Sequence, residues 1–268
     1  MANGRVAPGA GEESEALRRS IRRRALEALT ESGLLVAAVA LALVHAVART
    51  LDAALDLRVS VVVGAGTWAV YAFDRLVDDR IDRPARADFV RRNGSWMRAG
   101  AVLAAGVAVV AGLKLPPRAI ALLTAVVLLA LLHARLRHLP WIKPLYIALA
   151  WLAVVVGLPA VLAAAPPARV LADLAPIGLA ILANVIGCDV TDGEAEARAI
   201  GPVRARWVAR GVALAGVVAA AAGPERGLVW VPLVTLVALL PGPRPPGYTH
   251  VLDAALGVGG VLAWFALG

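Results

Sequence analysis

Long apolar runs, separated by short polar segments, organise this chain. Each run approaches the roughly 20 residues that an α-helix needs to cross a bilayer. Runs of this length predict an all-α integral membrane protein, a bundle of about nine transmembrane helices. The nine runs lie near residues 32–49, 58–74, 96–113, 118–134, 143–164, 169–188, 206–222, 226–240 and 249–267.

The chain before the first run has a different pattern. Residues 14–31 are predicted to form a basic amphipathic helix that lies along an anionic membrane surface. Its apolar positions, spaced four residues apart among five arginines, are Leu17, Ile21, Ala25 and Leu29. Residues 1–13 are expected to be disordered. A cleaved signal peptide at 18–50 is the less favoured alternative, because the charged lead is long and more apolar runs follow. We therefore divide the chain into an N-terminal segment, 1–31, and a polytopic domain, 32–268.

Composition supports the membrane assignment. Of the 268 residues, 60% are hydrophobic, and the mean hydropathy is +0.76. This exceeds the roughly 45–50% apolar content of soluble domains. The single cysteine, Cys188, excludes an internal disulfide framework and a cysteine-based zinc site. The net charge of +8 does not indicate nucleic-acid binding, because the basic residues lie between the apolar runs.

The distribution of basic residues predicts the topology. If the N-terminus is cytoplasmic, 21 of the 27 Lys and Arg residues fall on the cytoplasmic side and 6 on the other. Such a bias is typical of cytoplasmic loops. The connections on the opposite side are short and leave little room for an external domain. We therefore expect a multi-pass protein of the cell membrane whose functional site faces the cytoplasm.

A first acidic stretch, DRLVDDRID, follows the second run directly. Three of its aspartates recur every four residues and so share one face of a helix: Asp74, Asp78 and Asp82. Asp79 differs, because Arg75 and Arg83 stand four residues away on either side and can pair with it. No basic residue stands four positions along from Asp74 or Asp78 to offset the repulsion, which indicates that the three stacked carboxylates await an external cation.

A second acidic stretch follows the sixth run on the same predicted side. Asp189, Asp192 and Glu196 share a helix face. Carboxylates from two segments suit Mg²⁺, which takes one or two carboxylates together with phosphate oxygens of a substrate. The competing interpretation is that both stretches are merely solvated loops. Two stripes at span ends on one side favour the metal site.

A third segment on that side, residues 133–144, is basic. Arg135, Arg137 and Lys143 could hold phosphate oxygens that a metal leaves uncovered. Taken alone, however, they are better explained as topology signals. The four histidines show no metal-ligand spacing relative to one another.

These segments resemble, in order, the UbiA superfamily of intramembrane prenyltransferases. The resemblance rests on DRLVDD after a span, then RLRHLPWIKPLYIALAW, then DVTDGEAEARAIG, and covers the chain from about residue 32. It includes two Asp-rich motifs on the cytoplasmic side of nine helices. The chain departs from the first motif, since its Asn-Asp pair falls on Val70 and Tyr71. It departs from the second where Glu196 replaces the usual last aspartate. This YxxDRLxD form is similar to a divergent branch.

The resemblance implies Mg²⁺-dependent transfer of an isoprenyl group from a polyprenyl diphosphate to an acceptor, often aromatic. The implied catalytic residues are Asp74, Asp78, Asp189 and Asp192. The implied metal ligands are these four with Asp82 and Glu196. The implied diphosphate-binding residues are Lys143, Arg137, Arg135 and Arg75. The residues expected to shield the reacting carbon in the substrate pocket are Tyr71, Trp68 and Trp151.

Two other functions remain open at this point. The missing Asn-Asp pair is compatible with a catalytically degenerate membrane scaffold. A cation or metabolite transporter is less favoured, because the middles of the runs carry almost no charge; Asp253 lies near the start of the last one. The sequence leaves the acceptor, the prenyl chain length and the oligomeric state undetermined.

Overall fold

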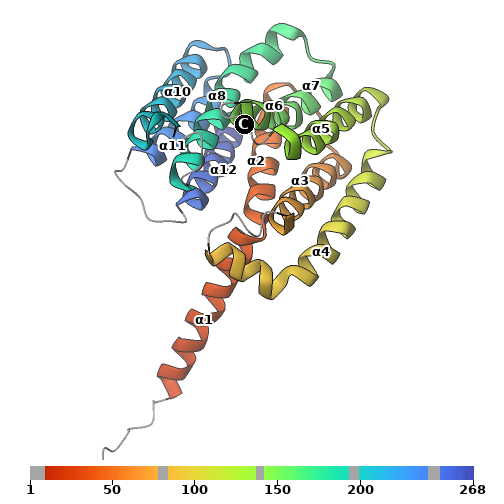
Figure 1. Ribbon diagram of the computed structural model, residues 1–268. Helices are drawn as coiled ribbons and strands as arrows, with labels where there is room; N and C mark the ends of the chain where they lie inside the picture. Colours follow the sequence, from red (N-terminus) through yellow and green to blue (C-terminus); the bar gives the residue numbers. More distant parts are fainter. Residues whose placement is uncertain (1–9, 78–83, 137–141, 193–198, 241–247) are drawn as a thin grey trace, which may run out of the picture.

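The computed structural model describes residues 10–77, 84–136, 142–192, 199–240 and 248–268, and every regular element in these ranges is helical (Figure 1). This confirms the all-α class. The helices are α1 (Ala10–Glu31), α2 (Leu34–Thr50), α3 (Leu57–Val77), α4 (Pro84–Gly112), α5 (Pro117–Leu136), α6 (Ile142–Leu152), the π-helix η1 (Ala153–Gly157), α7 (Leu158–Ala163), α8 (Pro167–Asp192), α10 (Pro202–Ala222), the 3₁₀-helix η2 (Arg226–Val229), α11 (Trp230–Leu239) and α12 (Thr249–Ala266).

Each of the nine apolar runs lies inside a helical segment, to within two residues. Within the described ranges, five helical segments are long and apolar enough to cross a membrane: Arg86–Gly112, Ile142–Ala163, Pro167–Asp192, Pro202–Ala222 and Thr249–Ala266. A sixth is added if α1 and α2 are counted together as one bent span. The helices thus indicate a multi-pass membrane protein, whereas nine crossings and a cytoplasmic N-terminus remain predictions.

Helix α2 lies at the centre of the bundle, in contact with both α3 and α12. Leu43 and Val47 of α2 are fully buried in a core shared with α8, η1 and α12. Gly260 allows α12 to approach α2 closely, because a Cβ there would lie 3.2 Å from the backbone nitrogen of Leu43. Small residues at such contacts let helix backbones pack tightly in a membrane.

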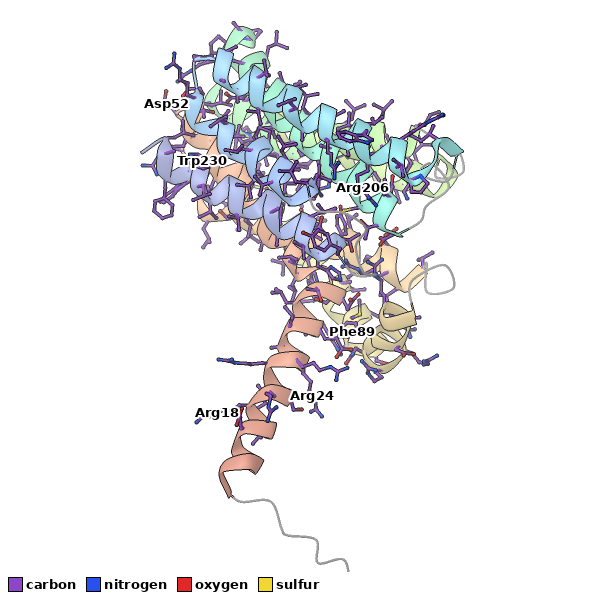
Figure 2. All side chains as sticks on the ribbon, turned by 90° about the vertical axis from the view of Figure 1, so that its left-hand side faces the viewer. Arg18, Arg24, Asp52, Phe89, Arg206 and Trp230 are labelled. Carbon is purple, nitrogen blue, oxygen red and sulfur yellow. The ribbon has the colours of Figure 1, made fainter. Side chains whose placement is uncertain are left out.

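Helices α1 and α2 meet at a sharp bend. Gly33, with φ of +88°, separates them, and their axes differ by 64°. Helix α1 projects from the bundle with Arg18 and Arg24 along its length (Figures 1 and 2). Its apolar side chains Leu17 and Ile21 are exposed. The predicted N-terminal helix is present but begins at Ala10 rather than near residue 14; its location on a membrane surface stays a prediction.

Two local features position the helices that matter below. Asp56 caps α3, since its Oδ1 accepts a hydrogen bond from the backbone N–H of Val59 at 3.1 Å. This hydrogen bond lowers the pKa of the Asp56 carboxyl. In the span after Ile142, Pro159 lacks an N–H and its ring crowds the carbonyl one turn earlier. A π-helical turn, Ala153–Gly157, precedes Pro159. Such π-bulges are single wide turns within an α-helix.

Candidate functional site

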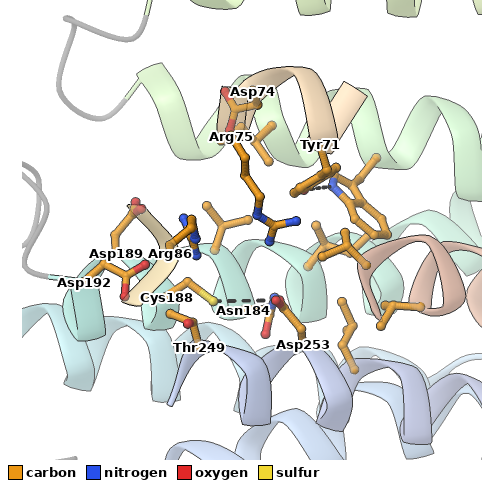
Figure 3. Close-up of a pocket in the computed structure, with 17 residues that line it drawn as sticks. Tyr71, Asp74, Arg75, Arg86, Asn184, Cys188, Asp189, Asp192, Thr249 and Asp253 are labelled. Atoms are coloured by element: carbon orange, nitrogen blue, oxygen red, sulfur yellow. Dashed lines mark hydrogen bonds between the residues drawn. The ribbon is translucent and has the colours of Figure 1, made fainter. Parts of the chain in front are cut away.

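A cavity of about 160 Å³ opens between α2, α3, α8 and α12. It brings together the two acidic stretches identified in the sequence, because Asp74 of α3 lines it together with Asp189 and Asp192 of α8 (Figure 3). These segments are separated by more than a hundred residues in the chain. The tertiary structure, rather than the spacing in the chain, places their carboxylates on the wall of one cavity.

The carboxylates differ in exposure. Asp74 and Asp192 are exposed, whereas Asp189 is 7% exposed and lies 3.4 Å from the Nζ of Lys143 in the first turn of α6. The ion pair places Lys143 beside the second acidic stretch, as expected for a residue that would share a phosphate group with it. Lys143 is oriented by Asp189 rather than by solvent.

The donor set suits a hard cation. Among the described residues, no three His, Cys, Asp or Glu side chains already converge as a metal site. Mg²⁺ does not require such a group, because it usually retains waters and binds one or two carboxylates plus substrate phosphates. Asp74, Asp189 and Asp192 supply carboxylate oxygens from two helices, so their chemistry fits Mg²⁺ held jointly with a diphosphate.

Arg75 has an unusual environment. It is 5% exposed, and its Nε and Nη1 atoms have no hydrogen-bond partner among the described residues. Figure 3 shows its guanidinium directed into the cavity, between Tyr71 and the Asn184–Asp253 pair. The guanidinium carbon lies 5.9 Å from the centre of the Tyr71 ring. Asp79, the partner that the sequence predicts for Arg75, lies outside the described residues.

The cavity residues missed by sequence reasoning include Asn184, Cys188 and Asp253. The Nδ2 of Asn184 donates a hydrogen bond to Oδ1 of Asp253 at 3.0 Å. The sulfur of Cys188 lies 3.9 Å from the same oxygen. The available signal was Asp253 itself, the one acidic residue in the last apolar run. Its position near the start of that run made it look peripheral, whereas α12 carries it into the cavity.

A polar cluster beside the cavity joins α1, α4 and α12. Arg86 Nε donates to Glu31 Oε2 at 3.4 Å, and His250 Nε2 lies 3.0 Å from Glu31 Oε1. Arg86 also lines the cavity. A second arginine, not singled out in the sequence, thus adds positive charge beside the acidic stretches.

The predicted aromatic residues separate into two groups. Trp151 Nε1 donates to the hydroxyl oxygen of Tyr71 at 3.1 Å, and both residues line the cavity. Trp68 lies elsewhere. Its indole nitrogen donates to the backbone oxygen of Ser32 at 3.1 Å, and its ring stacks on Trp96 at a centroid separation of 6.4 Å. The structure therefore brings Tyr71 and Trp151 to the cavity but not Trp68.

Several predicted site residues cannot be placed in this geometry. Those outside the described residues are Asp78, Asp82, Glu196 and Arg137. The backbone of Arg135 belongs to the last turn of α5, but its side chain is not described. The candidate site is accordingly built from Asp74, Arg75, Asp189 and Asp192, with Lys143 beside them.

No protein-family model, curated protein or solved structure matches this chain, so the residues and geometry above carry the functional argument.

Proposed function

We propose that this protein is a UbiA-like intramembrane prenyltransferase of the cell membrane. In this proposal nine helices cross the bilayer, the N-terminus is cytoplasmic and the cavity opens toward the cytoplasm. The reaction is Mg²⁺-dependent transfer of an isoprenyl group from a polyprenyl diphosphate to a lipophilic, often aromatic acceptor. The observation that supports it best is that Asp74, Asp189 and Asp192, from two distant acidic stretches, line one cavity with a buried arginine, Arg75, two of whose nitrogen atoms have no partner among the described residues.

The cavity residues have the charges that diphosphate departure needs. Mg²⁺, when bound by Asp74, Asp189 and Asp192, would neutralise the developing negative charge of the leaving group. Two nitrogen atoms of Arg75 have no hydrogen-bond partner in the part of the chain that the structure describes, and its guanidinium would bind diphosphate oxygens from the inner side. Lys143, adjacent to Asp189, would bind them from the outer side. The diphosphate then leaves with the electron pair of the broken C–O bond.

Deeper in the cavity the walls become apolar. Val39, Ile181 and Leu256 line this part, with the edge-on pair of Tyr71 and Trp151. An apolar wall excludes water, which would otherwise capture the allylic cation. The aromatic rings offer their faces to that cation. The acceptor forms the new bond to the prenyl carbon and releases one proton.

A binding experiment tests the proposal without knowledge of the acceptor. Geranylgeranyl diphosphate is titrated into the purified protein by calorimetry with Mg²⁺ and again with EDTA. We expect Mg²⁺-dependent binding that weakens at least tenfold in Asp189→Asn, because one charged ligand is lost. Asp52→Asn is the matched control, since Asp52 is an exposed aspartate that pairs with Arg169 away from the cavity. Binding that ignores both Mg²⁺ and Asp189 would contradict the metal-site assignment and favour a scaffold.

Transport is a second candidate, favoured by two carboxylates within spanning helices. Asp173 of α8 is fully buried, and Asp253 of α12 lines the cavity. Acidic residues in spans commonly mark ion or substrate paths. Proteoliposomes that show solute or proton flux dependent on Asp253, with no Mg²⁺-dependent binding of geranylgeranyl diphosphate, would favour transport over prenyl transfer.

A further inference from the structure

The polar residues of the cavity are arranged in layers. Along α8, from Asp192 back toward lower residue numbers, the chain passes Asp189 and then reaches Asn184. At a rise of 1.5 Å per residue, Asn184 lies about 7.5 Å deeper in the bundle than Asp189. Along α12, Asp253 lies one turn beyond Thr249, which also lines the cavity. Asn184 and Asp253 thus form an inner polar layer, between the outer carboxylates and the apolar wall (Figure 3).

This inner layer contains a hydrogen-bond acceptor that lacks a donor. The Nδ2 of Asn184 donates to Asp253, which leaves its Oδ1 as the remaining polar atom of the amide. That oxygen is buried and has no hydrogen-bond partner among the described residues, and Asn184 as a whole is 6% exposed. The Oδ1 of Asn184 can only accept a hydrogen bond, and it lies beside the carboxyl group of Asp253. Buried acceptors without donors are costly, so they indicate a ligand that supplies the missing donor.

The surroundings limit what that donor can be. The basic groups whose charges act on Asp253 are His250 of its own helix, Arg75 of α3 and Arg86 of α4. These positive groups disfavour a cationic ligand. An anion has no hydrogen to donate to the Oδ1 of Asn184, which can only accept. A neutral hydroxyl or amine remains, and the neighbouring Tyr71, Trp151 and Leu256 suit an apolar body attached to it.

We propose that Asp253 and Asn184 form the subsite that positions the second substrate, by accepting hydrogen bonds from a hydroxyl or amino group on a lipophilic molecule. Its assignment to the acceptor of prenyl transfer rests on the proposed function. The subsite itself does not, because its argument uses neither the metal nor the diphosphate. Asp253 and Asn184 are then specificity-determining residues, and Arg75 separates them from the diphosphate layer.

Calorimetric titration with two matched probes tests the subsite. The probes are 4-butylphenol and 4-butylanisole, which differ in the hydroxyl hydrogen that the subsite would bind. The titrations contain neither Mg²⁺ nor diphosphate. We expect wild-type protein to bind the phenol about tenfold more tightly than the ether, the usual worth of a hydrogen bond to a charged group. Equal affinities would overturn the proposal.

Three variants locate the discrimination. Asp253→Leu and Asn184→Leu each remove an acceptor, and we expect the preference for the phenol to fall below about threefold. Two substitutions are used so that a folding failure of one leaves the other informative. Asp173→Leu is the matched control, a buried aspartate of α8 that is bonded to Thr50 and does not line the cavity; it should retain the tenfold preference. Retention of the preference in either subsite variant would refute the assignment.

A further measurement separates this proposal from the proposed function. Asn184→Leu should still bind geranylgeranyl diphosphate with Mg²⁺ within about threefold of wild type, because Asn184 carries no charge and its amide is bonded to Asp253 rather than to a residue of the proposed donor site. Loss of phenol discrimination with intact donor binding supports two distinct subsites. Phenol discrimination without any donor binding would sustain the subsite and reject prenyl transfer. Parallel loss of both ligands in Asn184→Leu would overturn the division of the cavity.

Discussion

Arg75→Met should make the empty protein more stable while it weakens donor binding. Arg75 is 5% exposed and makes no ion pair with a described residue. A buried charge in this state costs several kcal/mol. The Tyr71 ring, 5.9 Å away, compensates about 0.5–2 kcal/mol, and the facing carboxylate of Asp253 compensates a further part. Methionine fills a similar volume without the charge.

The net gain expected for Arg75→Met is about 1.5 kcal/mol. At the roughly 2–4 °C per kcal/mol typical of a chain of this size, the Tm rises by about 3–6 °C. Thermal unfolding followed through the fluorescence of the seven tryptophans measures it. The same variant should lose at least tenfold in Mg²⁺-dependent affinity for geranylgeranyl diphosphate, since charge-assisted hydrogen bonds to phosphate disappear.

Arg91→Met is the control, because Arg91 is an exposed arginine of α4 that pairs with Asp88 on the same helix. Its effect on stability should stay within about 0.5 kcal/mol. A fall in Tm of several degrees for Arg75→Met would refute the reasoning. It would mean that Arg75 stabilises the fold through a partner such as Asp79, as the four-residue spacing predicts, and is not held for a ligand.

Three further substitutions test the surroundings of the cavity. Gly33→Ala should cost about 1–2 kcal/mol, because φ is +88° and the new Cβ would clash with the guanidinium of Arg75; it should therefore weaken donor binding as well. Gly201→Ala also places a side chain at a positive φ, +85°, but in open space, and should lower the Tm without affecting binding. Trp68→Phe should cost about 1 kcal/mol through its lost hydrogen bond to Ser32, with donor affinity unchanged. A lower affinity of Trp68→Phe for the diphosphate donor would show that Trp68 contributes to the donor-binding site after all.

The helices themselves were predictable, because an apolar run that is removed from water has few conformations other than a helix in which its backbone polar groups are hydrogen-bonded. In a bilayer an apolar segment must satisfy its N–H and C=O groups internally. Each of the nine runs accordingly lies inside a helical segment, including 226–240, where a 3₁₀ turn leads into α11. The breaks were less predictable. The π-helical turn before Pro159 and the bend at Gly33 depend on how neighbouring helices pack.

The site was only partly predictable for a related reason. Asp74, Asp189 and Asp192 could be identified because carboxylates at the ends of apolar runs are conspicuous, and Tyr71 and Trp151 because aromatic residues are rare here. Trp68 was predicted together with them, but it does not line the cavity. Periodicity shows which residues share a face of one helix, but it does not show which helix that face will meet.

The sequence alone therefore determines features that lie along the chain: the length of each apolar run, the polar segments between the runs, and the acidic and basic segments at their ends. These follow from local chemistry and from the thickness of a bilayer. Only the packing of α2, α3, α8 and α12 decides that Arg75 is buried and faces inward. The same packing brings Asn184 and Asp253 together in a hydrogen bond, in the cavity that Asp189 also lines. Helices rich in Ala, Val and Leu are apolar on every side, so their sequences carry little information about which neighbour each side will contact.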